Sequence, residues 1–336
     1  MKTIGKYFLC ISLVLLSGCQ SAQEPSQTTE KVKKEEVKKE EKVELKLSFV
    51  GDITLGNYAG QGMSGSFNQE YNNQNKNSHY FLKNVKSIFE KDDLTIANLE
   101  GPLTTASSHQ IKTFAFKGKP EYVEILKKGN IDVVTLANNH SQDYYSQGMK
   151  DTKKILKTNK IAYFGYETSA IQEVKGIKIG FLGYAFPYSM TKKMKQAIQT
   201  LKEKTDIVVV YYHWGIEGDG NPMASQREIA KQSIDNGADL VIGSHPHVLQ
   251  GYETYKGKNI VYSLGNFCFG GNKNPRDKDT AIYQHTFQFT DKKLTKETNH
   301  IIPCRLSSQT SRNNYQPTVV KGADAKRVLK KIHKMK

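Results

Sequence analysis

The sequence has few cysteines and few long apolar runs, and both shortages exclude classes of protein. Four cysteines in 336 residues are too few for a scaffold built from disulfides. The one long apolar run lies at the N-terminus, which excludes a polytopic membrane protein. Hydrophobic residues still make up 37% of the chain, enough for a sizeable core and too many for global disorder. We therefore expect one large folded domain, or two modest ones.

The N-terminal run has the pattern of a signal peptide at residues 1–18. Lys2 and Lys6 give a positive start, and the apolar segment that follows is too short to span a bilayer comfortably. It ends in Leu16-Ser17-Gly18-Cys19, which resembles a bacterial lipobox. The resemblance implies cleavage before Cys19, a lipid on its sulfur, and a location on the extracytoplasmic face of the bacterial cell membrane. A transmembrane helix is the alternative.

The excess of positive charge belongs mainly to the folded part. Residues 19–43 form a polar and then Lys/Glu-rich stretch, which predicts a solvated spacer ahead of a domain at 44–336. Of the net charge of +16, residues 1–29 and 30–46 carry +1 each, which leaves +14 for residues 47–336. Outside the cell membrane, a basic domain suggests an acidic capsule or cell-envelope polymer, or anionic lipid, as partner, and no nucleic acid.

Strand and helix patterns alternate after the spacer, which predicts an α/β domain with a buried sheet. The predicted strands are Leu45–Val50, Leu94–Ala97, Ile131–Ala137, Ile161–Phe164, Ile177–Leu182, Ile207–Tyr212, Leu240–Ile242, Ile260–Ser263 and Ala281–Phe289. The predicted helices are His79–Lys91, Glu121–Lys128, Gln147–Lys157, Lys192–Lys204, Ala224–Asn236 and Ala323–Lys334. Between the first strand and the first helix, the Asn- and Gly-rich segment Asn57–Asn77 is predicted to be a long loop.

Five of the predicted strands run into side chains that bind metals. These side chains, in chain order, are Asp52, Glu100, Asn139 with His140, His213, and His245 with His247. Open α/β sheets place their ligand crevices at the carboxyl ends of strands, so we expect these groups to meet at one edge. Their nitrogen and oxygen donors suit one or two divalent ions such as Mn, Zn or Fe.

Each of these residues also has a simpler interpretation. An Asp at a strand end is often a turn residue or a helix cap, and a histidine beside an aromatic, as His213 is beside Trp214, is often only packed in a core. His245-Pro246-His247 is more specific, because two imidazoles across one rigid proline need a reason to lie so close. The coincidence at five strand ends favours a site.

The order and spacing of these motifs from about residue 46 to 290 resemble the poly-γ-glutamate capsule biosynthesis family, CapA/PgsA. The motifs that carry the resemblance are Gly51-Asp52, Asn98-Leu99-Glu100, Asn138-Asn139-His140, His213-Trp214-Gly215-Ile216-Glu217, Gly243-Ser244-His245-Pro246-His247 and Ser263-Leu264-Gly265-Asn266-Phe267. That family is similar to calcineurin-like metallophosphoesterases. The resemblance therefore implies a calcineurin-like metallophosphatase α/β/β/α sandwich with a dinuclear metal site.

The resemblance also implies a role for each matched residue. Glu100 would bridge the two metals. Asp52 and His247 would bind the first, and the second would be bound by Asn139, His213 and His245. His140 would donate a proton to a leaving group or stabilise the transition state. Two positions depart from the phosphoesterase pattern: Thr54 stands where a histidine is expected, and the bridging position has Glu in place of Asp.

Three further residues are candidates for substrate binding. Asn98 comes with the Glu100 motif. Glu217, four residues after His213, would orient a ligand or a substrate amine, or else be a surface loop acid. Asn266 would face the crevice, or else serve a tight turn with Gly265.

Two classes of function remain open from the sequence. One is an envelope-anchored metallohydrolase acting on a polyanionic polymer or a phosphoester. The other is a non-catalytic component that holds a poly-γ-glutamate-type polymer, alongside membrane-bound polymer synthase subunits. A surface nucleotidase is a third reading. The two mature cysteines besides Cys19, Cys268 and Cys304, would pair in an oxidising compartment if their geometry allowed it.

Overall fold

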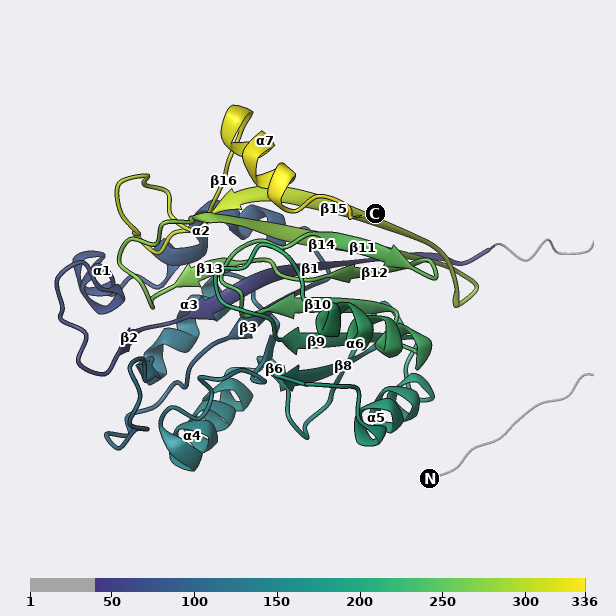
Figure 1. Cartoon of the computed structure of the whole chain (residues 1–336), viewed down its shortest axis with the longest axis horizontal. Coiled ribbons are helices and arrows are strands. Elements are labelled where there is room, and N and C mark those ends of the chain that lie inside the picture. The colour runs from purple at the N-terminus through teal and green to yellow at the C-terminus, as the bar shows by residue number, and fades with distance from the viewer. Residues whose placement is uncertain (1–39, 336) are drawn as a thin grey trace, which may run out of the picture. The chain divides into compact units, whose positions relative to one another are not determined.

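The structure, a computed structural model, describes residues 40–335 (Figure 1). The predicted signal peptide, the lipidation site Cys19 and the spacer up to residue 39 lie outside these residues and stay predictions. The first strand begins at Lys42, two residues before the predicted start of the domain. Among the described helices, none is both long and apolar enough to cross a membrane.

Two large sheets organise the described chain. The first contains β1 (Lys42–Thr54), β3 (Leu94–Leu99), β5 (Val133–Thr135), β6 (Ala162–Phe164), β13 (Asn266–Phe269), β14 (Asp279–Thr290), β15 (Lys293–Arg305) and β16 (Thr318–Val319). The second contains β7 (Ala170–Val174), β8 (Ile177–Ala185), β9 (Ile207–His213), β10 (Leu240–Ser244), β11 (Tyr252–Tyr255) and β12 (Lys258–Val261). The small strands β2 (Asn57–Tyr58) and β4 (Phe116–Lys117) form a separate pair.

Each sheet contains a run of four parallel strands. The first sheet has the order β16-β15-β14-β1-β3-β5-β6, with β13 also pairing with β1, and β1, β3, β5 and β6 run parallel. The second has the order β11-β12-β10-β9-β8-β7, with β8, β9, β10 and β12 parallel. Parallel strands bring their carboxyl ends to one edge, so each sheet has one edge where its loops can form a site.

The alternation of side chains along the strands produces three apolar layers. In β9, Ile207, Val209 and Tyr211 belong to the core between the two sheets. Val208, Val210 and Tyr212 point the other way and belong to a second core with the helices. A third core covers the opposite face of the first sheet. Both faces of the sheets are therefore buried, which explains why the parallel strands read as continuous apolar runs.

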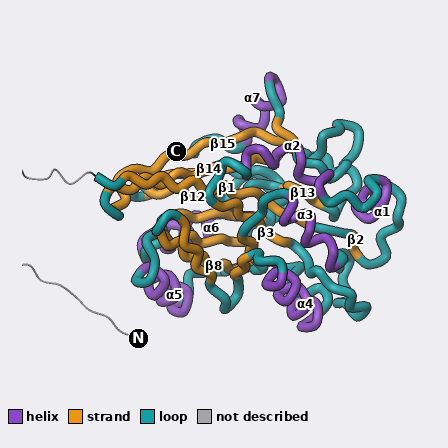
Figure 2. Tube along the Cα trace, turned by 180° about the vertical axis from the view of Figure 1, so that it is seen from behind, coloured by secondary structure: helices purple, strands orange, loops and turns teal. Residues whose placement is uncertain are grey.

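All helices except the last cover the outer faces of the two sheets (Figures 1 and 2), and the last packs Val328 on the core between the sheets. The helices are α1 (Phe67–Asn73), α2 (His79–Phe89), η1 (Pro120–Tyr122), α3 (Val123–Lys128), α4 (Tyr145–Thr158), α5 (Lys192–Lys202), α6 (Ala224–Asp235) and α7 (Gly322–Lys331). Apolar residues of α2, α3 and α4 pack on the first sheet, and those of α5 and α6 pack on the second. The predicted α/β/β/α sandwich is confirmed.

Some sequence predictions were wrong in detail. The segment Asn57–Asn77 is not one long loop, because it holds β2 and α1. Helix α1 begins at the cap residue Ser66, whose hydroxyl accepts a hydrogen bond from the Gln69 amide at 3.2 Å, and it buries Phe67 and Tyr71. Strands β7, β11, β13 and β15 were not predicted. Cys268 and Cys304, the two cysteines in the described part, are both free and buried, so the structure does not contain the disulfide left open above.

Gly51 is required where β1 passes the chain that enters β13. The Asp52 amide donates a hydrogen bond to the Gly265 carbonyl at 2.9 Å, and a Cβ on residue 51 would lie 1.8 Å from the same oxygen. Gly51→Ala is therefore expected to lower the free energy of unfolding by about 1–3 kcal/mol, as overpacking does, measured by urea denaturation. Gly62→Ala is the control, because nothing lies within 4 Å of its Cβ position. Equal stability of the two variants would contradict this close approach.

Candidate metal centre

The predicted metal-binding side chains lie at the carboxyl edges of the two sheets. Asp52 lies near the end of β1, and Glu100 directly follows β3. His213 is the last residue of β9, and His245 directly follows β10. The strands run further than the sequence suggested, so Asp52 and His213 are in strands rather than after them. The site therefore stands on rigid elements of both sheets.

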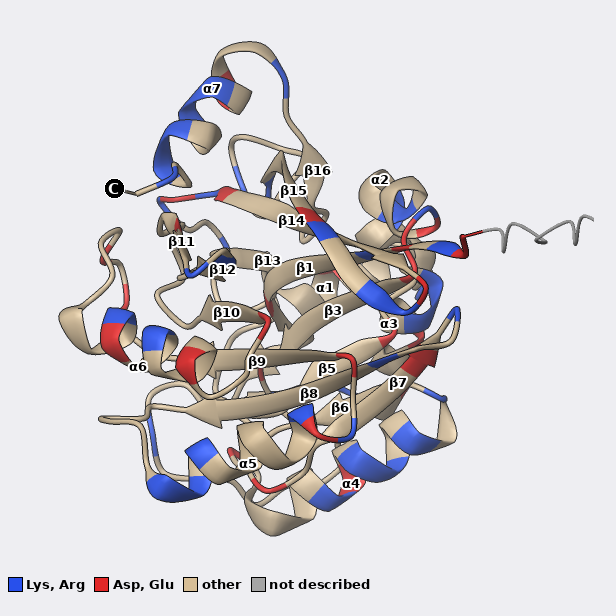
Figure 3. Ribbon diagram, turned by 90° about the vertical axis from the view of Figure 1, so that its right-hand side faces the viewer, with Lys and Arg blue, Asp and Glu red and all other residues tan. Residues whose placement is uncertain are grey.

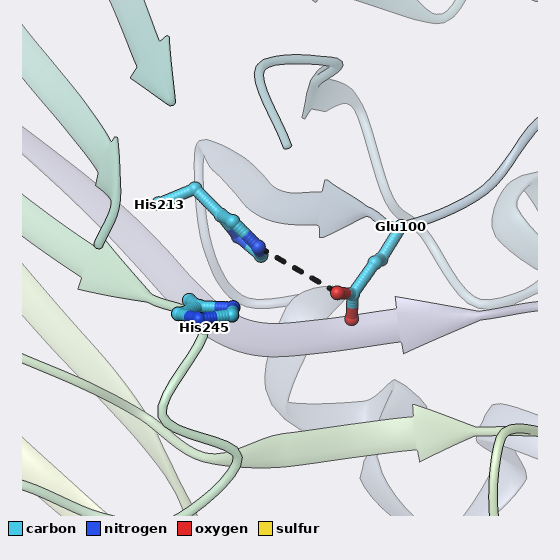
Figure 4. Close-up of side chains that lie close together, drawn as sticks. All are labelled: Glu100, His213 and His245. Atoms are coloured by element: carbon cyan, nitrogen blue, oxygen red, sulfur yellow. Dashed lines mark ion pairs between the residues drawn. The ribbon is translucent and has the colours of Figure 1, made fainter. Parts of the chain in front are cut away.

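The structure brings these side chains together in two groups that share one carboxylate. Asp52, Glu100 and His247 each offer a ligand atom within 4.8 Å of the others, and so do Glu100, His213 and His245. Figure 4 shows the Glu100 carboxylate and the rings of His213 and His245 facing one another. Glu100 belongs to both groups, as the bridging role implied by the sequence resemblance would require.

Two buried polar atoms of this cluster support a cation there. Glu100 Oε1 and His245 Nδ1 have no hydrogen-bond partner among the described residues, and both residues are buried. A buried polar atom without a partner costs free energy, and native proteins leave few of them. A divalent cation would satisfy these donors, so the residues present fit a metal ion.

Hydrogen bonds orient two of the histidines toward Glu100. Nδ1 of His247 lies 2.8 Å from Asn266 Oδ1 and 3.2 Å from Asp52 Oδ2, so its Nε2 points to Glu100 Oε1 at 3.9 Å. Nδ1 of His213 lies 3.0 Å from Ser244 Oγ, and its Nε2 lies 3.6 Å from the same Glu100 oxygen. Metal-binding histidines commonly have their second nitrogen fixed in this way.

The second group gains another donor from Asn139. Its Oδ1 lies 2.8 Å from His213 Nε2, on the side that faces Glu100. The first group has no matching addition from residue 54, because Thr54 Oγ1 lies 3.5 Å from Glu100 Oε2 and offers only a hydroxyl. The described residues thus give the second group four protein donors and the first group three.

The charges of the cluster shift its pKa values strongly. Burial raises the pKa of Asp52, but the hydrogen bond and charge of His247 outweigh burial and lower it to about 2. Burial, followed by the charge of Asp52, raises the pKa of Glu100 to about 8. Burial opposes the charged form of His247, yet the Glu100 and Asp52 carboxylates raise its pKa to about 10. Burial, with the charge of His247, lowers the pKa of His245 to about 4.

The backbone at the two adjacent histidines is strained. His245 has φ of 97° and His247 has φ of 58°, values that side-chain-bearing residues rarely adopt. Such strain persists only where the surrounding structure holds it, and it is concentrated at functional sites. The strain at His245-Pro246-His247 therefore agrees with a functional role for both rings.

His140 lies beside the cluster in a charge network that the sequence analysis missed. Its Nδ1 is 2.7 Å from Asp143 Oδ2, which also accepts a hydrogen bond from the Phe116 amide at 2.6 Å, and Lys112 pairs with the other oxygen. Burial lowers the pKa of His140, although Asp143 opposes the shift. Asp143 is three residues after His140, a spacing that could have suggested the pair.

Two of the three predicted substrate-binding residues have other partners. Asn98 is fully buried, and its amide donates to Asp52 Oδ1 at 2.8 Å and accepts from Asn138 at 2.9 Å. Asn266 is buried and holds the ring of His247. Both side chains are buried and hold Asp52 and His247 in place, and their contact with a substrate stays a prediction. Glu217 is exposed at the mouth of the site.

The fold and the site together define a two-sheet α/β protein with a buried cluster of potential metal ligands at its strand ends. Residues 46–271 match the family described as bacterial capsule synthesis protein, PGA_cap, and the chain belongs to this family.

Curated relatives agree with the family. The chain is 35% identical to the PGA biosynthesis protein CapA of Bacillus subtilis, over 72% of this chain and 67% of the relative. It is 32% identical to the capsule biosynthesis protein CapA of Bacillus anthracis, over 74% of this chain and 65% of the relative. The chain thus spans about two thirds of the length of these relatives.

Solved structures with a similar arrangement are more distant. A hypothetical protein from Thermus thermophilus is 16% identical with a TM-score of 0.47, over 77% of this chain and 99% of that chain. A phosphatase from Mycoplasma pneumoniae is 16% identical with a TM-score of 0.45, over 78% of this chain and 94% of that chain. At these scores the likeness carries no argument about activity.

Proposed function

We propose that this protein takes part in the synthesis or export of a capsule polymer, through a metal-dependent hydrolytic site, while anchored by a lipid on Cys19 at the outer face of the cell membrane. Family membership supports the capsule role. The observation that carries the metal site is the buried Glu100 Oε1, which has no hydrogen-bond partner and faces the histidines of both groups.

The charge of the protein supports an acidic polymer as the substrate. Residues 47–336 carry a net charge of +14. Figure 3 shows Lys and Arg at many positions along the ribbons of α4, α5 and α7. A polymer of the poly-γ-glutamate type carries a carboxylate on every unit. The basic surface would therefore attract it over distances up to about the Debye screening length. Membrane-bound synthase subunits would supply such a chain.

The residues around the cluster have distinct tasks in this proposal. Asp52, Glu100 and His247 would hold one divalent ion, and Glu100, Asn139, His213 and His245 the other. Divalent ions at such sites supply Lewis-acid activation of water and of the group it attacks. Nδ1 of His140 must donate to Asp143, so in the neutral ring Nε2 is the basic nitrogen, and the lowered pKa favours this form near pH 7. His140 would therefore first accept a proton from the attacking water and then donate it to the leaving group.

A non-catalytic role in holding the polymer is the second candidate. Thr54 favours it, because this residue leaves the first group with three protein donors. Hydrolysis separates the two candidates. Wild type and His140→Ala would be compared on poly-γ-glutamate and on a phosphodiester, and general acid–base catalysis predicts a loss of about 10²–10⁴-fold in the variant. Tight binding of polymer without cleavage by either protein would assign the holding role.

The metal content of the full chain tests the site itself. We expect about two equivalents of a transition metal by elemental analysis, and loss of the first-site metal when Asp52 and His247 are both replaced by alanine. His300→Ala is the control, because this histidine is exposed on β15 away from the cluster. If wild type bound no metal after loading with Mn or Zn, the hydrolytic proposal would be wrong.

A further inference from the structure

Glu217 adds a third carboxylate to the candidate metal centre from the solvent side. One of its carboxylate oxygens, one ring nitrogen of His245 and one ring nitrogen of His247 all lie within 4.8 Å of one another. Asp52 and Glu100 are fully buried, whereas Glu217 is exposed. The two histidines therefore have buried carboxylates on one side and Glu217 at the mouth.

Backbone hydrogen bonds hold the loop that carries Glu217 against the loop that carries the two histidines. The Trp214 amide donates to the Ser244 carbonyl at 3.0 Å, and the Gly218 amide donates to the Pro246 carbonyl at 2.8 Å. Glu217 lies between these two tethers, one residue from the second. These two hydrogen bonds therefore fix the backbone on both sides of Glu217 next to His245 and His247.

A glycine fixes the turn that directs Glu217 inward. Gly215 has φ of +85°, and a Cβ there would lie 2.8 Å from Gln226 Oε1. That side chain is buried and accepts a hydrogen bond from the Met223 amide at 2.8 Å. Gly215 thus lets the loop between β9 and α6 pass close to Gln226, two residues before Glu217.

The number of protein ligands and the net charge of the cluster both favour one more negatively charged ligand. The group of Asp52, Glu100 and His247 has three protein donors, fewer than the four to six ligands that divalent first-row metals take. Asp52 and Glu100 would leave two divalent ions with a net charge of +2 in a buried site, and a third carboxylate reduces this to +1. His245 Nδ1 is buried without a hydrogen-bond partner, which fits a cation on this side of the cluster.

We propose that Glu217 is a further protein ligand of the divalent first-row transition metal that Asp52, Glu100 and His247 would hold, and that it closes the centre from the solvent side, next to His245. This inference rests on the metal site of the proposed function and goes beyond it, because Glu217 then does not act by contacting substrate. Its exposed position means that it completes the coordination without being needed for folding.

Titration of the metal-free full chain with Co²⁺ tests this assignment. The number of ions bound and their affinities come from calorimetry, and the visible d–d absorption reports the ligands of each ion. In Glu217→Gln we expect one of the two affinities to fall at least about tenfold and the absorption of that ion to change, with the other ion unaffected. Asp219→Asn is the matched control, since this carboxylate lies in the same loop and accepts only from the Asn221 amide at 2.9 Å in the structure.

The outcomes separate this inference from the proposal on which it rests. Wild-type affinities and an unchanged spectrum in Glu217→Gln would overturn the role of Glu217 and leave the metal site intact. A wild-type chain that bound no Co²⁺ would overturn both. An equal loss in Asp219→Asn would show that the charge of the loop matters and not coordination by Glu217, and would also overturn the assignment.

Discussion

Replacing Glu100 by glutamine is expected to abolish tight metal binding at both groups of the cluster. Its Oε1 lies 3.6 Å from His213 Nε2 and 3.9 Å from His247 Nε2, so one carboxylate serves both sites. Partners that only orient a metal ligand already change affinity about 10–100-fold, so loss of the shared ligand should exceed about 100-fold at each site. Elemental analysis and calorimetry with Zn or Mn measure the loss.

The same substitution should leave the metal-free protein folded. Burial and the charge of Asp52 raise the pKa of Glu100 to about 8, so at pH 7 the metal-free protein holds this carboxyl mostly protonated, and glutamine has nearly the same shape and charge. Unchanged urea denaturation of the metal-free variant would verify this. Glu203→Gln, an exposed acid after α5, is the control. A variant that kept one full equivalent at wild-type affinity would show that the two groups do not share Glu100.

The position of the site could be predicted from the sequence because it follows from parallel strands. The apolar runs before His213 and His245 are continuous, those before Asp52 and Glu100 are interrupted by single polar residues, and the carboxyl ends of parallel strands meet at one edge. The angle between the two sheets did not have to be predicted, because any sandwich that places these two edges side by side brings the polar groups together.

The residues that support the site were harder to predict, since their roles depend on contacts across the chain. Asn98 resembles a substrate-binding residue in the sequence, yet the structure uses its amide to hold Asp52, 46 positions away. Asn266 lies 19 positions from His247, whose ring it orients. Spacing predicts which residues lie on one edge of a sheet, but it does not show whether an amide faces solvent or a neighbouring ligand.

Strand β15 was missed for a different physical reason. Its sequence Lys293–Arg305 shows no regular apolar alternation, and one of its residues is fully buried. The strand is held by its long antiparallel pairing with β14 and by a few apolar contacts, such as those of Leu294 and Ile302. The turn before it consists of Asp291 and Lys292, both with positive φ, which suits a two-residue hairpin although Lys is uncommon in such turns.

Metal affinity is expected to rise steeply with pH between about 6 and 8. In the metal-free protein Glu100 keeps a proton up to a pKa of about 8, and His247 keeps one up to about 10. Burial holds His245, with a pKa of about 4, and His213 neutral at these pH values. Ligands must lose their protons to bind a metal, so filling both groups at pH 7 releases about two protons.

The number of protons released determines the sign and size of the pH dependence of metal affinity. Because two protons are released, the product of the two affinities rises up to about 100-fold for each pH unit below 8. Between pH 8 and 10 only His247 still has a proton to lose, so the product rises about tenfold for each pH unit. Calorimetric titration with Zn²⁺ at pH 6, 7 and 8, in two buffers with different heats of ionisation, gives both the affinity and the protons released. A chelator titrated in the same buffers calibrates the buffer and metal contributions. An affinity independent of pH over this range would mean that Glu100 and His247 are already deprotonated in the metal-free protein, and that Glu100 is a buried carboxylate rather than a carboxyl group.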